Sequence, residues 1–397
     1  MAEPKLRFRQ DDGSNYPAWK EMPLSALISD NLDPVPTPKE GYRRVGIYCH
    51  AKGTFQEDVS AEKVLDVDTM YRIHKDNLIV NITFAWEHAV AIVKPEDEGL
   101  LVSHRFPEYS FNDGQVPGFY KYLILRPYFR NQLSLASPGG AGRNRVLNKA
   151  QFKQIPVSVP CEAEQRKIAD FLSAVDEVIS TSEQEVANLE MQKKAVMKKI
   201  FSQEVRFKRD DGTAFPEWEE KKLGDVGSVL MCKRVFKEQT DGKGDIPFFK
   251  IGTFGGRPDA YISQELYDEL KEKYSYPKKG NILLSAAGTI GRAVVYCGEP
   301  AYYQDSNIVW LDHDETLSDE YLLHFYSMTS WNNLEGGTVK RLYNGILLDK
   351  DIGIPCLEEQ HLIADFLSDF DEAITAAKKE LELWKELKKG LLQQLFV

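Results

Sequence analysis

The residues that could do chemistry in this chain form no complete catalytic motif. A nuclease of the PD…(D/E)xK type can be traced only through Asp259, Glu269 and Lys271, on short charged segments. The sequence holds no Walker A loop, no GxSxG nucleophile motif and no HExxH zinc motif. The D/N-P-P-Y/F motif of amino-group methyltransferases is also missing, since residues 31–34 read NLDP. The sequence therefore favours a binding protein, with a cryptic nuclease as an alternative.

Several glycine-rich loops carry arginine, lysine and small polar side chains instead. These side chains suit the edges of DNA bases, and loops held by a rigid scaffold present them well. Such loops occur at residues 137–145, 250–257, 285–292 and 336–345. The candidate DNA-binding residues are Lys52, Asn81, Thr83, Arg143, Asn144, Arg145, Lys250, Thr253, Arg257, Ser285, Thr289, Arg292, Lys340, Arg341 and Asn344.

The composition is that of an ordinary soluble protein with more than one domain. The 397 residues are 42% apolar and 28% charged. No apolar run approaches the ~18–20 residues of a membrane helix, and the start has no signal-peptide pattern, so we expect a cytoplasmic protein. The five cysteines form no CxxC pair, which argues against a disulfide framework and a structural zinc site.

The charge is acidic overall but unevenly distributed. A net charge of −11 discourages binding of DNA by the bulk field of the protein. Residues 24–155 carry 16 basic and 15 acidic side chains, whereas residues 223–352 carry 14 and 19. Any contact with DNA must therefore come from local clusters of basic side chains.

The chain repeats itself. Residues 7–19 (RFRQDDGSNYPAW) and 206–218 (RFKRDDGTAFPEW) share seven of thirteen positions. Residues 160–179 and 355–374 share thirteen of twenty positions without a gap. We infer a tandem duplication. Its parts are a leader and first module at 1–155, a central helix at 156–204, a second leader and module at 205–352, and a C-terminal helix at 353–397.

Each copy of the longer repeat continues into a heptad pattern, in which apolar residues alternate four and three positions apart. A seam sustained over nearly four heptads predicts a coiled-coil pair. Lys193 and Lys388 interrupt the seam at the same place, and they either reach solvent, set the register or contact a partner. The residues expected to pack the helices or bind partners are Val175, Ile179, Val186, Leu189, Val196, Ile200, Phe370, Ile374, Leu381, Trp384, Leu391 and Leu395.

The modules between these helices differ from them in character. They are rich in aromatic residues, glycine and proline, with short strand-like runs such as NLIVN at 77–81 and NILL at 281–284. Each module is predicted to be a mixed α+β domain, and their mutual similarity in sequence is faint. The predicted architecture is α+β, with two globular recognition domains separated by two long antiparallel helices in a pseudo-twofold tandem repeat.

The duplicated segments resemble the specificity subunits of type I restriction–modification systems. The resemblance rests on the EQ…IADFLS helices, on the RFxxDDGxxxPxW leaders and on the GTIGR stretch at 288–292, and it covers essentially the whole chain. The second copy reads GIPCLEEQ, a shortened version of the IPxxxP spacing at 155–160.

The resemblance implies separate roles for the modules, the helices and the partner subunits. Each module would be a target-recognition domain that reads one half of a bipartite, asymmetric sequence in double-stranded DNA. The helices would hold the half-sites at a fixed separation and dock two modification subunits, which bring S-adenosylmethionine and the adenine-methylating site. Restriction subunits, with ATP and Mg²⁺, would complete the endonuclease. The chain itself would be non-catalytic and would hold no metal or cofactor.

The length of the helices agrees with that interpretation. A helix over residues 174–202 spans roughly 40 Å at ~1.5 Å per residue, close to one DNA turn of ~34 Å. Two further interpretations stay open. One is a tandem-module coiled-coil scaffold whose modules bind protein or carbohydrate, and the other is a homodimeric coiled-coil adaptor.

Overall fold

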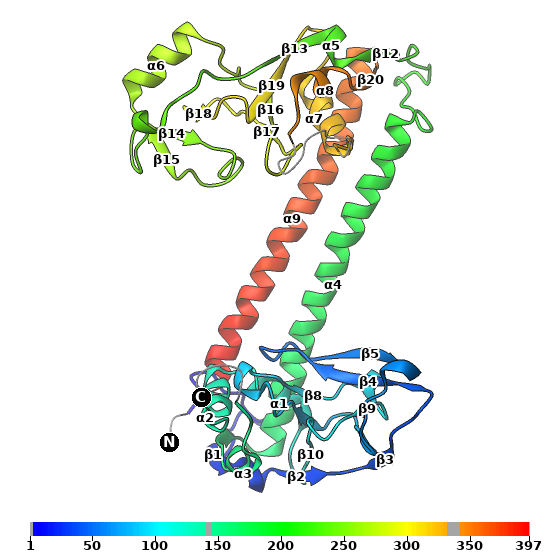
Figure 1. Ribbon diagram of the computed structural model, residues 1–397, viewed down its shortest axis with the longest axis vertical. Coiled ribbons are helices and arrows are strands. Elements are labelled where there is room, and N and C mark those ends of the chain that lie inside the picture. Colours follow the sequence, from blue (N-terminus) through cyan, green and yellow to red (C-terminus); the bar gives the residue numbers. More distant parts are fainter. Residues whose placement is uncertain (1–2, 140–144, 332–340, 397) are drawn as a thin grey trace. The chain divides into compact units, whose positions relative to one another are not determined.

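The computed structural model describes residues 3–139, 145–331 and 341–396 (Figure 1). It divides into two compact units, Met1–Glu183 with Lys379–Val397, and Gln184–Lys378. Each unit holds one leader, one module and part of each of the two long helices, α4 (Glu162–Phe201) and α9 (Leu357–Leu395). Within the described ranges, no helix has the length and apolar character needed to cross a membrane.

The first module is built on a four-stranded antiparallel sheet. Its strand order is β2 (Ile28–Asn31), β10 (Glu108–Phe111), β7 (Leu78–Val80) and β8 (Val90–Ile92). A separate strand pair joins the leader to the helix, through β1 (Lys20–Pro23) and β11 (Pro156–Val159). The helices are α1 (Pro117–Leu123), α2 (Pro127–Leu135) and α3 (Lys149–Lys153). A five-stranded sheet has the order β3 (Pro34–Pro36), β6 (Thr69–Arg72), β9 (Leu101–Val102), β4 (Gly41–Ile47) and β5 (Thr54–Ser60).

The second module is built on an equivalent four-stranded sheet, but its second sheet is smaller. Its four-stranded sheet has the order β13 (Gly227–Leu230), β19 (Ile308–His313), β16 (Ile282–Ser285) and β17 (Ala293–Val295). The pair β12 (Glu219–Lys222) and β20 (Asp351–Ile354) again joins leader to helix. A three-stranded sheet has the order β15 (Ala260–Ile262), β14 (Ile246–Phe249) and β18 (Tyr302–Tyr303). The helices are α5 (Leu223–Val226), α6 (Gln264–Lys273), α7 (Asp319–Met328) and α8 (Asn344–Leu348). Short 3₁₀ turns complete the two modules, at η1 (Leu24–Ala26), η2 (Ala61–Lys63), η3 (Ala85–Glu87), η4 (Pro95–Asp97) and η5 (Lys237–Gln239).

The two modules therefore share a topology that their sequences hardly show. The strands β2, β10, β7 and β8 occupy the places of β13, β19, β16 and β17 in the same order. A buried strand requires apolar side chains at the right positions, and many residues satisfy this, so sequence identity can be lost while the sheet is kept. The predicted α+β architecture with a tandem repeat is confirmed.

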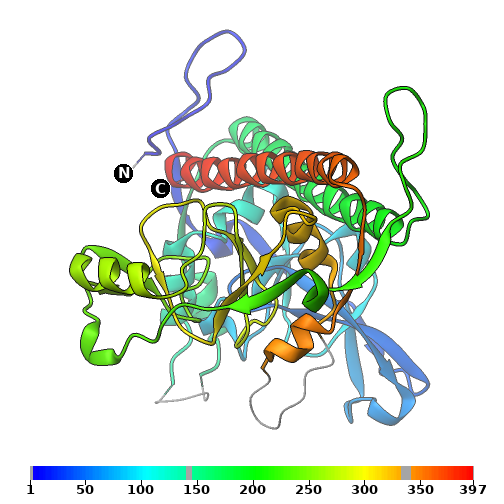
Figure 2. The same ribbon diagram turned by 90° about the horizontal axis from the view of Figure 1, so that it is seen from above.

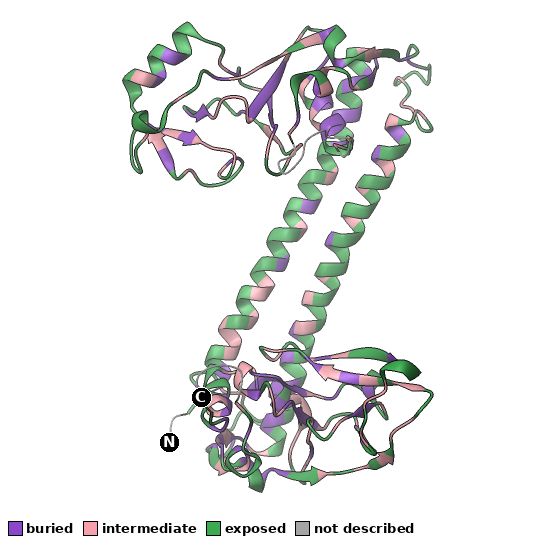
Figure 3. Cartoon of the chain, in the orientation of Figure 1, coloured by how far each residue is buried: buried purple, intermediate pink, exposed green. Residues whose placement is uncertain are grey.

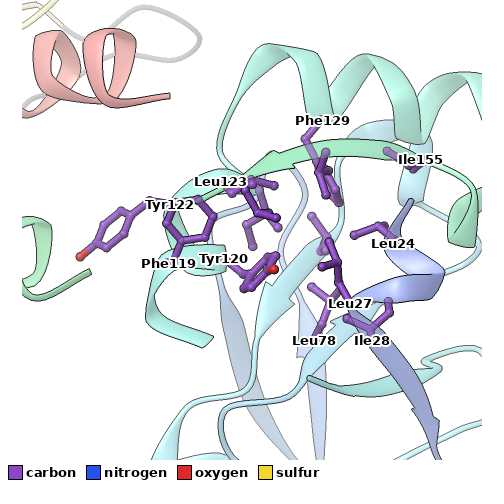
Figure 4. Packing of buried hydrophobic residues seen from close by; sticks show 14 of the residues in the cluster. Leu24, Leu27, Ile28, Leu78, Phe119, Tyr120, Tyr122, Leu123, Phe129 and Ile155 are labelled. Carbon is purple, nitrogen blue, oxygen red and sulfur yellow. The ribbon is translucent and has the colours of Figure 1, made fainter. Parts of the chain in front are cut away.

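Apolar side chains from several elements form the core of the first unit (Figure 4). Leu27, Leu78 and Phe119 are buried in one cluster with residues of α2 and of the two long helices. The leader closes this cluster, because the ring of Trp19 lies 5.8 Å from that of Phe119. In the second unit the ring of Trp218 lies 6.2 Å from that of Tyr321 in the same way.

A buried ion pair fastens each leader to a long helix. Arg7 donates from Nη2 to Glu164 Oε2 at 2.8 Å and from Nε to Oε1 at 3.1 Å. Arg206 donates to the two oxygens of Glu359 at 2.8 and 3.2 Å. Both carboxylates are 0% exposed. Because a buried carboxylate needs a charged partner, this contact accounts for the retention of both residues in both repeats.

The neighbouring glutamine fastens the module to the same helix. Gln165 Oε1 accepts the backbone N–H of Val116, just before α1, at 2.9 Å. Gln360 Oε1 accepts the backbone N–H of Ser318, just before α7, at 2.8 Å. The repeated EQ dipeptide thus holds the leader with its glutamate and the module with its glutamine.

Within each unit the segments of α4 and α9 run antiparallel. In the first unit Asp176 and Glu183 of α4 pair with Lys388 and Lys385 of α9. In the second unit Glu190 and Lys193 of α4 pair with Lys378 and Asp371 of α9. The twelve apolar residues predicted for the seam are all buried or half-buried, on helices that are otherwise largely exposed (Figure 3).

The two lysines in the seam do not simply reach into solvent. Lys193 Nζ lies 2.5 Å from Asp371 Oδ1, and Lys388 Nζ lies 2.5 Å from Asp176 Oδ1. The side chain of Lys193 is only 14% exposed. Both lysines therefore form ion pairs across the two helices, as the role in setting the register requires, whereas a contact with a partner stays a prediction.

Candidate nucleic-acid interface

Two loops come together at one edge of the sheet in each module. In the first module the loop between β7 and β8 lies beside the segment that leads to α3, because Leu147 N–H donates to Ile82 O at 2.8 Å. In the second module the loop between β16 and β17 lies beside the segment that leads to α8, because Leu342 N–H donates to Ala286 O at 2.8 Å. Segments far apart in the sequence thus form one surface in each module.

Some of the predicted residues lie outside the part of the chain that the structure describes. These are Arg143 and Asn144 in the first module and Lys340 in the second. The other predicted residues are placed in one of the two loops or close to them.

In the first module two of the predicted residues hold the shape of the loop. Asn81 is 9% exposed, and its Oδ1 accepts the backbone N–H of Thr83 at 3.0 Å. Arg145 donates to the backbone oxygens of Ser134 and Ser137, and its guanidinium carbon lies 5.5 Å from the ring centre of Trp86. Asn81 thus holds the loop and also lines the hollow beside it, and its contact with a base stays a prediction.

A hollow of about 520 Å³ lies next to this loop. Thr83, Phe84 and Arg105 line it, together with Arg44 and His104. Phe84 is 39% exposed, so it offers an aromatic surface beside cationic groups. The sequence analysis missed these residues, except for Thr83, because the hollow is assembled from strands far apart in the chain.

The turn between β4 and β5 adds Lys52 near the same loop. His50 N–H donates to Glu87 O at 2.9 Å, and Ala51 N–H donates to His88 O at 2.8 Å. These bonds hold the turn against η3, and Lys52 is exposed at its tip. The first module therefore gathers polar, aromatic and basic side chains from three separate segments.

In the second module the predicted residues divide in the same manner. Ser285 is 2% exposed, and its hydroxyl donates to Thr289 O at 2.5 Å and accepts the Arg292 N–H at 2.9 Å. This burial corrects the prediction that Ser285 contacts a ligand. Arg341 donates to Ser306 O at 2.7 Å. These bonds fix the turn and leave Thr289 exposed at its tip.

The loop at residues 250–257 meets this turn. Arg292 Nη1 donates to Phe254 O at 2.7 Å and so joins the two predicted loops. Lys250 pairs with Asp259 at 2.7 Å, and the Thr253 hydroxyl bonds to the backbone of Lys250. Arg257 is exposed on this loop, and Asn344 is exposed at the start of α8. The second module thus joins three of the predicted loops into one surface.

The residues of the alternative nuclease interpretation do not converge. Asp259 pairs with Lys250, Glu269 pairs with Lys273 at 3.0 Å, and Lys271 Nζ donates to the Tyr267 hydroxyl at 3.1 Å. Among the described residues, no group of three or more acidic, histidine or cysteine side chains is placed to hold a metal ion. The structure therefore lends this alternative no support.

Comparison with known families matches both modules. The model of the "Type I restriction modification DNA specificity domain" matches residues 49–191 and 216–383. A putative type I restriction enzyme specificity subunit, S.HindORF215P of Haemophilus influenzae, is 45% identical over 262 residues, which is 62% of this chain and 67% of that protein. The putative MjaX specificity subunit of Methanocaldococcus jannaschii is 24% identical over 86% of this chain and 81% of its own length.

Two solved structures share the fold. One is the S subunit of a type I restriction–modification system from M. genitalium, with a TM-score of 0.57 at 13% identity over 100% of this chain and 99% of that one. The other comes from a study of complex assembly and conformational transition in a type I system, with a TM-score of 0.57 at 18% identity over 96% of this chain and 98% of that one.

Proposed function

The chain belongs to the family of type I restriction–modification DNA specificity domains, and we propose that each of its modules reads one half of a two-part DNA sequence. It is the DNA-recognition subunit of such a system. The observation that carries the proposal is that the two modules share the strand order of their four-stranded sheets and present different loops at the same edge of those sheets. A shared sheet with different loops suits a target whose two halves differ in sequence.

The side chains at these edges have the chemistry that base reading needs. Arginine, threonine and asparagine bond to base edges in the major groove, and aromatic rings contact methyl groups and sugars. Arg105, Thr83 and Phe84 supply these groups in the first module, and Arg257, Thr289 and Asn344 supply them in the second. Because the protein is acidic overall, partner subunits would provide much of the contact to phosphates.

We further propose that two copies of one modification subunit bind the repeats. Each leader forms a hairpin, bridged between Arg9 and Asn15 in the first unit and between Lys208 and Ala214 in the second. Both units expose the same acidic and aromatic residues on this leader hairpin and on the first turns of α4 or α9, and we call these residues the duplicated patch. A phenylalanine of each leader supports the patch, since the rings of Phe8 and Phe171 lie 5.5 Å apart and those of Phe207 and Phe366 lie 5.6 Å apart. Figure 2 shows each leader hairpin extending away from the rest of its unit. The members of the patch are Asp11, Asp12, Asp170, Phe171 and Glu177, and Asp210, Asp211, Asp365, Phe366 and Glu372.

Contacts within each unit account for part of the patch, since Asp12 and Asp211 accept the backbone N–H of Ser14 and Thr213 in the hairpin turns. Asp170, Glu177, Asp365 and Glu372 are exposed and also identical, so we attribute their retention to a shared partner. In this proposal the modification subunits bring S-adenosylmethionine, and restriction subunits bring ATP and Mg²⁺. The complex would work in the cytoplasm, where the DNA lies.

The test is methylome sequencing of a host that carries this chain with its neighbouring genes. A gapped, two-part methylated motif is expected. Arg105→Ala should relax one or two base positions in one half of the motif by about tenfold, because a good base contact contributes about 1–3 kcal/mol. Arg43→Ala is the matched control, since Arg43 pairs with Asp58 on the adjacent strand and does not line the hollow.

Two results would contradict the proposal. The first is an ungapped motif, or methylation that does not depend on this chain. The second is an Arg105→Ala motif that is unchanged in both halves, or changed in both.

A further inference from the structure

The ion pairs between α4 and α9 fall into two classes. Those of Asp176 with Lys388 and of Asp371 with Lys193 are equivalent, because the repeat places Asp176 and Lys193 in register with Asp371 and Lys388, 195 positions later. The same shift places Glu183 and Glu190 in register with Lys378 and Lys385. At these two positions the first helix is therefore acidic and the second is basic.

The second class consists of two cross-helix pairs on the same side of the seam. Lys385 Nζ lies 3.0 Å from Glu183 Oε1 in the first unit, and Lys378 Nζ lies 2.6 Å from Glu190 Oε1 in the second. All four residues directly follow a seam position on the carboxyl-terminal side, so they correspond to the e positions of the heptads. Charges at such flanking positions set partner choice and orientation in coiled coils.

A second copy of the chain offers each helix a partner of its own kind. If α4 paired with α4 of another copy in the same antiparallel register, Asp176 would still meet Lys193, but Glu183 would meet Glu190. If α9 paired with another α9, Lys378 would meet Lys385. The Asp–Lys pairs thus tolerate either arrangement, whereas the Glu–Lys pairs oppose pairing between like helices.

The exposure of these groups agrees with a role in choosing the partner. The four side chains are 40–54% exposed. Ion pairs at such positions contribute little to overall stability because water screens them. A selective interface nevertheless gains when each wrong pairing brings like charges together.

We propose that Glu183, Glu190, Lys378 and Lys385 form a pairing code that directs each helix to the other repeat of its own chain and against the same repeat of a second copy. The code ensures that the two repeats of one chain pair with each other and not with the repeats of a second copy. It makes no use of what the modules bind.

Two full-length variants of unchanged net charge test the code. The variant Glu190→Lys with Lys385→Glu makes each helix complementary to its own kind, and it places like charges across the pair within one chain. The control variant Glu183→Lys with Lys385→Glu only reverses one ion pair, so the pairing within one chain stays favourable. Both variants share the change at Lys385.

Each variant is co-expressed as two copies with different affinity tags, and the second tag is measured after purification on the first. The first variant should retain at least fivefold more of the second tag than the control at low salt. The difference should shrink near 1 M salt, where charges are screened within about 3 Å. Equal retention of the second tag by the two variants at low salt would overturn the proposal, whatever their melting temperatures.

Discussion

At the scale of single residues, the leader contact is the most demanding electrostatic feature of the chain. The carboxylate of Glu359 is fully buried, and it accepts from Arg206 and also from Trp218 Nε1 at 3.0 Å. The hydrogen bond to Glu359 raises the pKa of Arg206, which keeps the guanidinium charged. A buried carboxylate that loses its cation has no comparable replacement.

We therefore expect Arg206→Ala to destabilise the second unit by about 3 kcal/mol, near the lower end for breaking a buried ion pair. Arg209→Ala is the control, because Arg209 lies 3.5 Å from Glu358, whose side chain is 63% exposed, and such a pair contributes less than about 1 kcal/mol. Differential scanning calorimetry of both variants measures the difference. Equal decreases in stability for the two variants would show that the buried pair of Arg206 and Glu359 contributes no more than an exposed ion pair.

Two buried histidines predict a loss of stability in mild acid. Burial lowers the pKa of His88, whose Nε2–H donates to Ile124 O at 2.7 Å, and burial also lowers the pKa of His324. The folded protein therefore keeps both rings neutral, while the unfolded chain binds protons below about pH 6.5. Stability from these groups is present above that pH and falls as the pH drops toward their lowered folded values.

The variant His88→Gln tests this for one ring, because a glutamine amide can still donate toward Ile124. Urea unfolding at several pH values should show a smaller loss of stability between pH 7 and pH 5 in the variant than in the natural chain. Above pH 7.5 the two proteins should depend on pH alike. An equal loss of stability between pH 7 and pH 5 in both proteins would show that protonation of His88 does not contribute to it.

The sequence identified the loops of the candidate site better than it identified the side chains. Glycine with arginine marks a turn near a functional edge, and the structure places those turns together. The sequence pattern does not show which polar side chain points inward. Ser285 and Asn81 were therefore predicted to bind DNA although both are buried. Phe84 and Arg105 were missed because the hollow depends on β4 and β9, whose pairing is set by tertiary contacts.

At the scale of elements, the start of each long helix also serves as the anchor of a module. Gln360 is fully buried and bonds to the Ser318 N–H, to Thr316 O at 2.7 Å and to Pro355 O at 2.9 Å. These partners belong to two segments, the one that leads into α7 and the one that leads into α9. The side chain amide therefore fixes where α7 begins relative to α9.

Gln360→Ala should destabilise the second unit by about 1–3 kcal/mol, because it leaves buried backbone groups without partners. Gln264→Ala is the control, since Gln264 is exposed at the start of α6 and bonds only to Asp268 among the described residues. Chemical denaturation with matched protein concentrations measures both variants. Similar small effects would mean that water replaces the lost amide.

The long helices were predictable because their apolar spacing repeats over many residues. The runs at 77–81 and 281–284 were also predictable as strands, and they form β7 and β16. The pair β4 and β5 was missed, although each strand has seven residues. It carries exposed ion pairs such as Arg43 with Asp58, so these strands lack the continuous apolar run that marks β7 and β16 in the sequence.

At the scale of the whole molecule, the residues that stayed identical after the duplication include those that make the contacts between leader and helix. The leader and helix residues that hold a unit together, such as Arg7 with Glu164, stayed identical in both repeats. The strands of the module sheets share their order but little of their sequence. The loops at the edges changed most, so a duplicated scaffold came to carry two different surfaces.

The last prediction concerns the helices as a spacer between those surfaces. Each of α4 and α9 is one continuous helix of about 40 residues. Seven residues inserted at matching places in both helices preserve the heptad seam and add about 10.5 Å of rise. One base pair occupies about 3.4 Å along DNA. The gap in the methylated motif should therefore grow by about three base pairs while both half-sites keep their bases.

An insertion of four residues in both helices is the control, because it breaks the alternation of apolar positions and should lower the melting temperature instead. Methylome sequencing of the seven-residue variant decides the matter. Bases that change while the gap stays constant would exclude the helices as the spacer. Helix length would then affect which bases the modules recognise and not the distance between the two half-sites.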